Sequence, residues 1–165
     1  MDMTALFNLS YGVYAVTTWA KGKPTGCIAN SAMQITSKPA TVAVSINHDN
    51  YTNKCIKDTG IFAVNILGEG VDPIIIGSFG FRSGRDTDKF EGIEPLVKEF
   101  TPVLPQAMSY ITCKVVNTLE TDTHTIFLGQ VTDAGNLRQD TPMTYSYYHK
   151  VVKGTTPKNA PTFRG

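Results

Sequence analysis

The sequence predicts a mainly β protein, an antiparallel β-barrel with a few short helices. Thr, Val and Ile number 21, 13 and 12, whereas Leu and Ala number 8 and 11, and β-branched side chains favour strands over helices. Large apolar residues alternate with small ones in 41–47, as in a strand that buries one face. Short turns, rather than long helices, join the predicted strands. This pattern favours an antiparallel barrel over a doubly wound sheet.

Apolar patterning, together with Gly, Pro and Asn at the breaks, predicts the order of the elements. Strands are expected at residues 11–20, 25–36, 41–47, 61–67, 108–120 and 125–134. The small residues of 41–47 leave room for a ligand on one face. Turns are expected at 21–24, at 37–40, near Asp122 and at Gly135-Asn136. Three prolines make 91–105 irregular.

Three short helices complete the expected domain, at residues 51–59, 71–79 and 143–152. Asn50 is suited to cap the first helix and Gly60 to end it, while Asp72-Pro73 is typical of the start of the second. The polar segment 81–90 is expected to be a loop.

Length and composition predict one domain at residues 1–152 and a tail, 153–165, that packs on the domain or on a partner subunit. The net charge of +1 argues against a basic nucleic-acid-binding surface. The sequence has no run of about 18 apolar residues and no signal-like N-terminus, so no membrane association is expected. Three separated cysteines without a C-x-x-C pair predict free thiols, a cytoplasmic location and no metal site.

Two segments carry residues suited to binding a flat, phosphorylated ligand. Small residues in 25–31 would let such a ligand approach the backbone, although an ordinary edge strand has the same composition. Asn50 and Thr52 stand at a predicted helix N-terminus, which favours phosphate, although simple capping needs the same residues. Arg82, Arg85 and Lys89 also suit phosphate, yet they fit a solvated loop equally well.

Two side chains are candidates for a direct role in a reaction. His124, at a predicted strand start, is able to donate a hydrogen bond or act as an acid, or to be a structural turn residue. Cys27 is a candidate thiol, but no Cys/His/Asn pattern indicates a cysteine hydrolase.

Seven motifs in register give the chain a clear resemblance to one family. They are Tyr11-Gly-Val-Tyr-Ala-Val-Thr-Thr18, Gly26-x-x-Ala29-Asn30-Ser31, Ser37-Lys-Pro39, Ala43-Val-Ser-Ile-Asn47, Asn50-x-Thr52, Phe79-Gly-Phe-Arg-Ser-Gly84 and His124-Thr-x-Phe-x-Gly129. The chain resembles the flavin reductase-like family, and within it flavoredoxins, prokaryotic ferric reductases and the flavin module of high-molecular-weight rubredoxins. The similarity extends through 144–149 and 158–161 near the C-terminus.

The resemblance implies a homodimeric FMN-binding split β-barrel with FMN near the subunit interface. It implies flavin contacts from Thr25, Gly26, Cys27, Ile28, Ala29, Asn30 and Ser31 at the ring, Ser45 and Ile46 beneath it, Asn50 and Thr52 at the phosphate, and Phe79, Gly80, Arg82 and Ser83 from the loop. His124 and Cys27 are the expected catalytic residues. Many members read Gly-Asp-His-Thr where this chain has Asp122-Thr123-His124-Thr125, so the turn before His124 is expected to differ.

The implied function is an oxidoreductase that takes hydride from NAD(P)H to FMN N5. Its electrons would pass to a separate acceptor, either free flavin, a ferric chelate or an iron protein such as rubredoxin or a flavodiiron protein. Hydride transfer needs no general base, which agrees with the lack of paired carboxylates. Two alternatives stay open: an FMN electron carrier without NAD(P)H oxidation, and a non-catalytic flavin-binding module.

Overall fold

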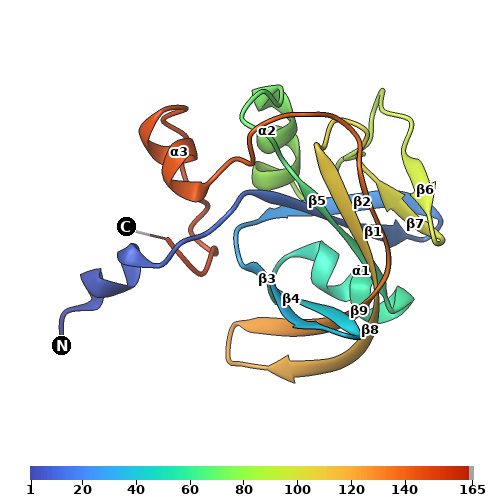
Figure 1. The fold of residues 1–165 in the computed structure, drawn as a ribbon, viewed down its shortest axis with the longest axis horizontal. Helices are drawn as coiled ribbons and strands as arrows, with labels where there is room; N and C mark the ends of the chain where they lie inside the picture. The colour runs from blue at the N-terminus through green and yellow to red at the C-terminus, as the bar shows by residue number, and fades with distance from the viewer. Residues whose placement is uncertain (164–165) are drawn as a thin grey trace.

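The computed structural model describes residues 1–163 and is built on one seven-stranded antiparallel sheet (Figure 1). Its order is β2-β1-β5-β8-β9-β4-β3. The strands are β1 (Tyr14–Ala20), β2 (Lys23–Ala29), β3 (Ala32–Ser37), β4 (Ala40–Asn47), β5 (Ile61–Ile66), β8 (Ser109–Glu120) and β9 (His124–Asn136). The predicted mainly β class is confirmed. The sheet curls without closing, so β2 and β3 form its two edges although they follow one another in the chain.

The three α-helices begin and end within about two residues of the predicted bounds, whereas the 3₁₀-helix near the N-terminus was not predicted. The helices are the 3₁₀-helix η1 (Met3–Asn8) and the α-helices α1 (Tyr51–Thr59), α2 (Pro73–Phe81) and α3 (Tyr145–Lys150). Asn50 Oδ1 accepts a hydrogen bond from the Thr52 N–H at 3.1 Å, and Gly60 has φ of 71° where α1 ends. Asp72 caps α2 by accepting from the Ile74 N–H. The caps predicted for α1 are therefore confirmed.

Three predicted segments differ from the structure. The strand expected over 25–36 is two strands, because the chain crosses to β4 at Ser31, whose carbonyl accepts from the Ser45 N–H. The segment 91–105 contains a small hairpin, formed by β6 (Leu96–Lys98) and β7 (Thr101–Val103). Strand β9 continues through the turn expected at 135–136, because Gly135 leaves room for the Tyr110 ring on the neighbouring strand.

Among residues 1–163, buried apolar side chains form three clusters, and the two larger ones lie on opposite faces of the sheet. Neighbouring residues of β1 belong to different clusters, Val16 to one and Ala15 to the other. One cluster surrounds α1 inside the curled sheet and includes Val44, Ile46, Ile56, Phe62 and Phe127. The other lies beneath α2 and includes Val13, Leu67, Ile75, Ile76, Phe79 and Leu104. Alternating strand residues thus attach one helix to each face.

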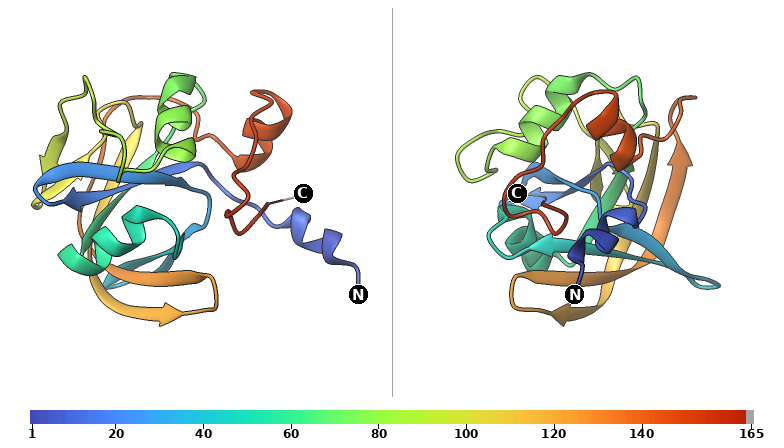
Figure 2. Two further views of the ribbon diagram at one scale, coloured as in Figure 1. Left: turned by 180° about the vertical axis from the view of Figure 1, so that it is seen from behind. Right: turned by 90° about the vertical axis from the view of Figure 1, so that its left-hand side faces the viewer.

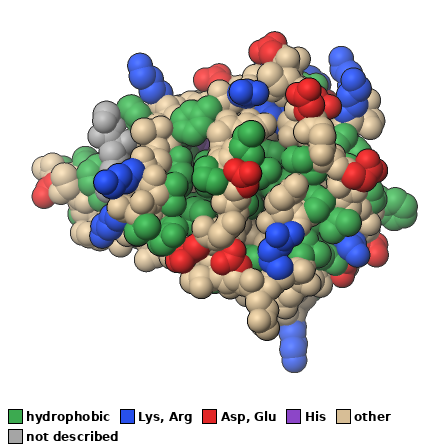
Figure 3. Space-filling model, turned by 90° about the horizontal axis from the view of Figure 1, so that it is seen from above, with side chains coloured by type: hydrophobic (Ala, Val, Ile, Leu, Met, Phe, Trp, Pro, Cys, Tyr) green, Lys and Arg blue, Asp and Glu red, His purple; other side chains and the backbone are tan. Residues whose placement is uncertain are grey.

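Helix η1 and the segment that follows α3 lie on the same side of the molecule (Figure 2). Helix η1 extends away from the body, whereas the segment after α3 folds back against it. Figure 3 shows Lys and Arg side chains dispersed among Asp and Glu on the face above α2, with apolar side chains between them. No helix within residues 1–163 is long and apolar enough to span a membrane.

Candidate flavin site

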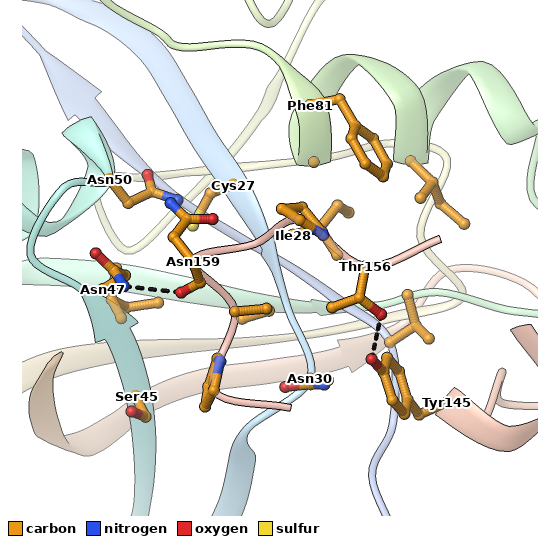
Figure 4. A pocket seen from close by; sticks show the side chains of 18 of the residues that line it. Cys27, Ile28, Asn30, Ser45, Asn47, Asn50, Phe81, Tyr145, Thr156 and Asn159 are labelled. Carbon is orange, nitrogen blue, oxygen red and sulfur yellow. Dashed lines mark hydrogen bonds between the residues drawn. The ribbon is translucent and has the colours of Figure 1, made fainter. Parts of the chain in front are cut away.

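A pocket lies between the edge strand β2, strand β4, helix α2, the N-terminus of α1 and the segment after α3 (Figure 4). It brings together eight residues predicted for the flavin from four separate segments. These are Cys27, Ile28, Ala29, Asn30, Ser45, Ile46, Asn50 and Gly80. Segments that are 50 residues apart in sequence therefore meet at one site, as the motifs predicted.

Strand β2 presents its free edge to this pocket. It pairs with β1 on one side, and among the described residues no strand pairs with its other side. Four consecutive residues, 27–30, line the pocket. Because consecutive strand residues point to opposite faces, the pocket must run along the strand edge itself. Unpaired backbone N–H and C=O groups at such an edge are suited to bond the rim of a flat polar ring.

The N-terminus of α1 forms one end of the pocket. Asn50 caps this helix and lines the pocket. The Cys27 thiol points toward the Asn50 side chain (Figure 4). Burial raises the pKa of Cys27 to about 11, against the opposing effects of Thr52 and Lys89. The thiol is therefore neutral at pH 7, which does not favour the nucleophilic thiolate of a catalytic cysteine. Its position makes Cys27 a lining residue.

Two buried polar groups, Thr25 and Lys89, lie behind this end of the pocket, near Cys27, and neither belongs to the lining itself. Thr25 Oγ1 is buried and has no hydrogen-bond partner in residues 1–163. Gly84, in the loop after α2, lies against this hydroxyl. The Lys89 side chain is 3% exposed, and its Nζ donates to the Phe79 carbonyl at 2.9 Å. Burial, partly opposed by the neighbouring Cys27, lowers the pKa of Lys89 to about 8.

These groups fit the phosphate end of FMN. A buried ammonium without a carboxylate partner is costly unless an anion joins it. A helix N-terminus and an unpaired hydroxyl supply further donors for that anion. The donors present therefore have the chemistry that a phosphate needs. They lie at the end of the pocket where the sequence predicts the phosphate, next to Asn50 and Thr52.

Comparison with known proteins places the chain in a family. The family described as "Flavin reductase like domain" matches residues 6–156. The chain belongs to this family. It is 44% identical over 165 residues to high molecular weight rubredoxin of Moorella thermoacetica, covering 99% of this chain and 72% of that protein. It is 39% identical to a ferric-chelate reductase (NAD(P)H) of Archaeoglobus fulgidus, with 99% and 98% covered.

A solved structure supports the same fold. Flavoredoxin from Methanosarcina acetivorans superimposes with a TM-score of 0.73 at 27% identity, over 81% of this chain and 74% of that one. The predicted membership of the flavin reductase-like family and the split-barrel type of fold are thereby confirmed.

Several residues that were predicted to contact the flavin lie outside the pocket. Gly26 faces the core, where Val16 and the Phe79 ring approach it. Phe79 is itself buried, with its ring edge-on to Phe90 at 5.3 Å. Ser31 lines a neighbouring hollow, together with Tyr11 and Met33. The remaining residues outside the pocket lining are Thr25, Thr52, Arg82 and Ser83.

His124 stands next to the pocket rather than in it. It pairs across the sheet with Asn47, which lines the pocket. Its Nδ1 lies 2.8 Å from Thr123 Oγ1, and its buried Nε2 has no hydrogen-bond partner in residues 1–163. Burial and then the nearby His48 lower the pKa of His124, so the imidazole is neutral at pH 7. Because Nε2 is buried, the ring has to turn before this nitrogen can reach a group in the pocket.

The pocket also contains residues that the sequence reasoning did not assign to it. Asn47 and Phe81 adjoin predicted site residues. Val13, before β1, and Ile76 of α2 are two more. The others come from α3 and the tail: Tyr145, Tyr148, Thr155, Thr156, Pro157, Asn159, Ala160 and Pro161. The similarity at 144–149 and 158–161 was the available signal, since these motifs lie far along the chain from the other pocket motifs.

Proposed function

We propose that this chain is an NAD(P)H-dependent FMN oxidoreductase that delivers electrons to a separate acceptor. The observation that carries the proposal is the pocket itself, which joins a free strand edge at 27–30 to the N-terminus of α1 beside the buried Lys89. A planar ring fits the first element and a phosphate the second. FMN has this combination without needing the further nucleotide site that FAD would require.

The protein's part is to bind and orient the cofactor. Bound FMN supplies the redox chemistry by accepting a hydride and passing electrons on. The edge of β2 holds the ring rim, Ser45 and Ile46 support the ring, and the α1 N-terminus with Lys89 holds the phosphate. We propose that the buried, unpartnered Nε2 of His124 hydrogen-bonds a ligand group once the ring turns toward the neighbouring pocket.

The acceptor that we propose is a ferric chelate, a free flavin or a small iron protein. The names of two relatives support this proposal, since one is a ferric-chelate reductase and the other a high molecular weight rubredoxin. Comparing the rates at which the reduced protein loses electrons to each acceptor would choose between them.

Anaerobic mixing with NADH or NADPH tests the reductase activity. We expect the visible absorption band of FMN-loaded protein to bleach rapidly with one nucleotide and to return when a ferric chelate is added. Free FMN at the same concentration is the control. Protein that binds FMN but is not bleached by either nucleotide would contradict the reductase and favour an electron carrier. Protein that binds no FMN would contradict both.

We also propose that the chain forms a homodimer, as the resemblance implied. The sheet face that packs around α1 also carries an apolar hollow lined by Tyr14, Val64 and Ile111, and the exposed Met33 of edge strand β3 lines it too. Light scattering is expected to give twice the monomer mass for the wild type and the monomer mass for Met33→Asp. Lys38→Asp, in the turn that follows β3, is the matched control. A monomeric wild type would contradict the proposal.

A further inference from the structure

The segment that follows α3 passes over the mouth of the pocket and forms one of its walls. Residues 155–157 and 159–161 line the pocket together with β2 and β4 (Figure 4). Pro157, Ala160 and Pro161 supply apolar surface there, so this wall is able to cover a planar ring and displace water from it. We call residues 155–162 the strap.

Hydrogen bonds attach the strap to both strands that line the pocket. Asn47 Nδ2 on β4 donates to the Asn159 carbonyl at 2.7 Å. Asn30 Nδ2, just after β2, donates to Thr162 Oγ1, and that hydroxyl donates to Tyr145 Oη at 3.1 Å. One end of the strap is therefore held by β4 and β2 on either side of the pocket.

The other end of the strap is held by α3. Tyr148 Oη donates to the Thr155 carbonyl at 3.1 Å, and Tyr145 Oη bonds to Thr156 Oγ1. Gly154 precedes these contacts and lies against the Tyr148 ring, since a Cβ there would fall 1.9 Å from Cζ. A helix on one side and two strands on the other thus fix a short segment across the opening.

We propose that the strap closes over bound flavin and determines how fast the flavin leaves the protein, with Thr162 as the positioning residue that fastens it. This inference rests on the proposed function. A fastened strap retains FMN as a prosthetic group through many turnovers, whereas a loosened strap lets FMN exchange as a substrate would. The Thr162 hydroxyl is the decisive contact, because it joins the strap to Asn30 and to Tyr145 at once.

Release of FMN from the full-length protein tests this role without any pyridine nucleotide. Dilution of the FMN complex restores flavin fluorescence as the flavin leaves. Thr162→Val removes the hydroxyl at constant shape and should speed release about tenfold, the effect expected for one or two lost hydrogen bonds. Thr162→Ser keeps the hydroxyl and should restore slow release. Thr118→Val, on the exposed end of the β8–β9 hairpin, should leave the rate unchanged.

Unchanged or slower release of FMN from Thr162→Val would overturn the proposed role of the strap. Trypsin provides a second measurement on the wild type, because the exposed Lys158 lies within the strap. Bound FMN should slow cleavage after Lys158, and faster cleavage with FMN would overturn closure over the flavin. Failure of NAD(P)H to bleach the flavin would contradict the proposed reductase activity but not the proposed closure of the strap. Failure of the wild type to bind FMN would contradict both.

Discussion

Replacing Lys89 with methionine is expected to weaken FMN binding by about tenfold to a hundredfold, the range of one charge-assisted hydrogen bond. Riboflavin, which has the same ring and no phosphate, should bind to the variant almost as it does to the wild type. The reason is the position of Lys89, a buried ammonium that donates to one carbonyl and has no carboxylate partner in residues 1–163. Fluorescence titration of both flavins measures the difference.

The pKa of Lys89 adds a pH dependence with a defined sign. Burial lowers this pKa from 10.5 to about 8, so the ammonium that favours phosphate is lost as pH rises above about 8. FMN affinity should therefore fall above pH 8 in the wild type and stay flat in Lys89→Met. The flavin-free protein should gain stability from about pH 8 to pH 10.5, because the unfolded chain then binds more protons than the folded one.

Lys54→Met is the matched control for charge. Lys54 is an exposed lysine on α1 whose ammonium pairs with Asp58, so its removal should change FMN affinity little. Equal losses of FMN and riboflavin in Lys89→Met would contradict the phosphate contact and would point to a general change in the pocket.

Local patterns were enough to predict most of the elements. The alternation of Val42, Val44 and Ile46 gave β4 and its buried face, because strand side chains point alternately to either side. Asn50 and Gly60 gave both ends of α1, because capping depends on a few neighbouring residues. Apolar alternation across 25–36, however, was unable to separate β2 from β3, whose partners lie elsewhere in the chain.

The site was predictable where a motif places several residues on one short segment. Residues 27–30, Ser45, Ile46 and Asn50 line the pocket as expected. Lys89 was left open between a phosphate contact and a solvated loop, because its burial depends on how residues 80–90 fold against α2. The tail at 153–165 is predicted to pack on the domain or on a partner subunit, but its place over the pocket depends on contacts with Asn30 and Asn47 more than 100 residues earlier. Such long-range packing is not encoded in local periodicity.

Replacing Gly26 with alanine is expected to lower the free energy of unfolding of the flavin-free protein by about 1–3 kcal/mol, the usual cost of overpacking a core. An added Cβ would lie 2.6 Å from the Val16 carbonyl oxygen and 2.9 Å from Thr17 Cγ2. The first contact is with backbone in a paired strand, so β1 and β2 must separate to relieve it. Urea unfolding followed by the fluorescence of Trp19 measures the change.

Gly77→Ala is the matched control and should change stability in the opposite direction. Gly77 lies in α2, where an added Cβ meets nothing within 4 Å. Alanine there should stabilise by about 0.5–1 kcal/mol, because it favours the helix. Comparing the two variants also shows whether Gly26 serves core packing or flavin binding. If Gly26→Ala weakens FMN binding without lowering the unfolding free energy, then Gly26 contacts the flavin as the motif implied. A large loss of stability in the flavin-free protein assigns it instead to the packing of β2 against β1 and Phe79.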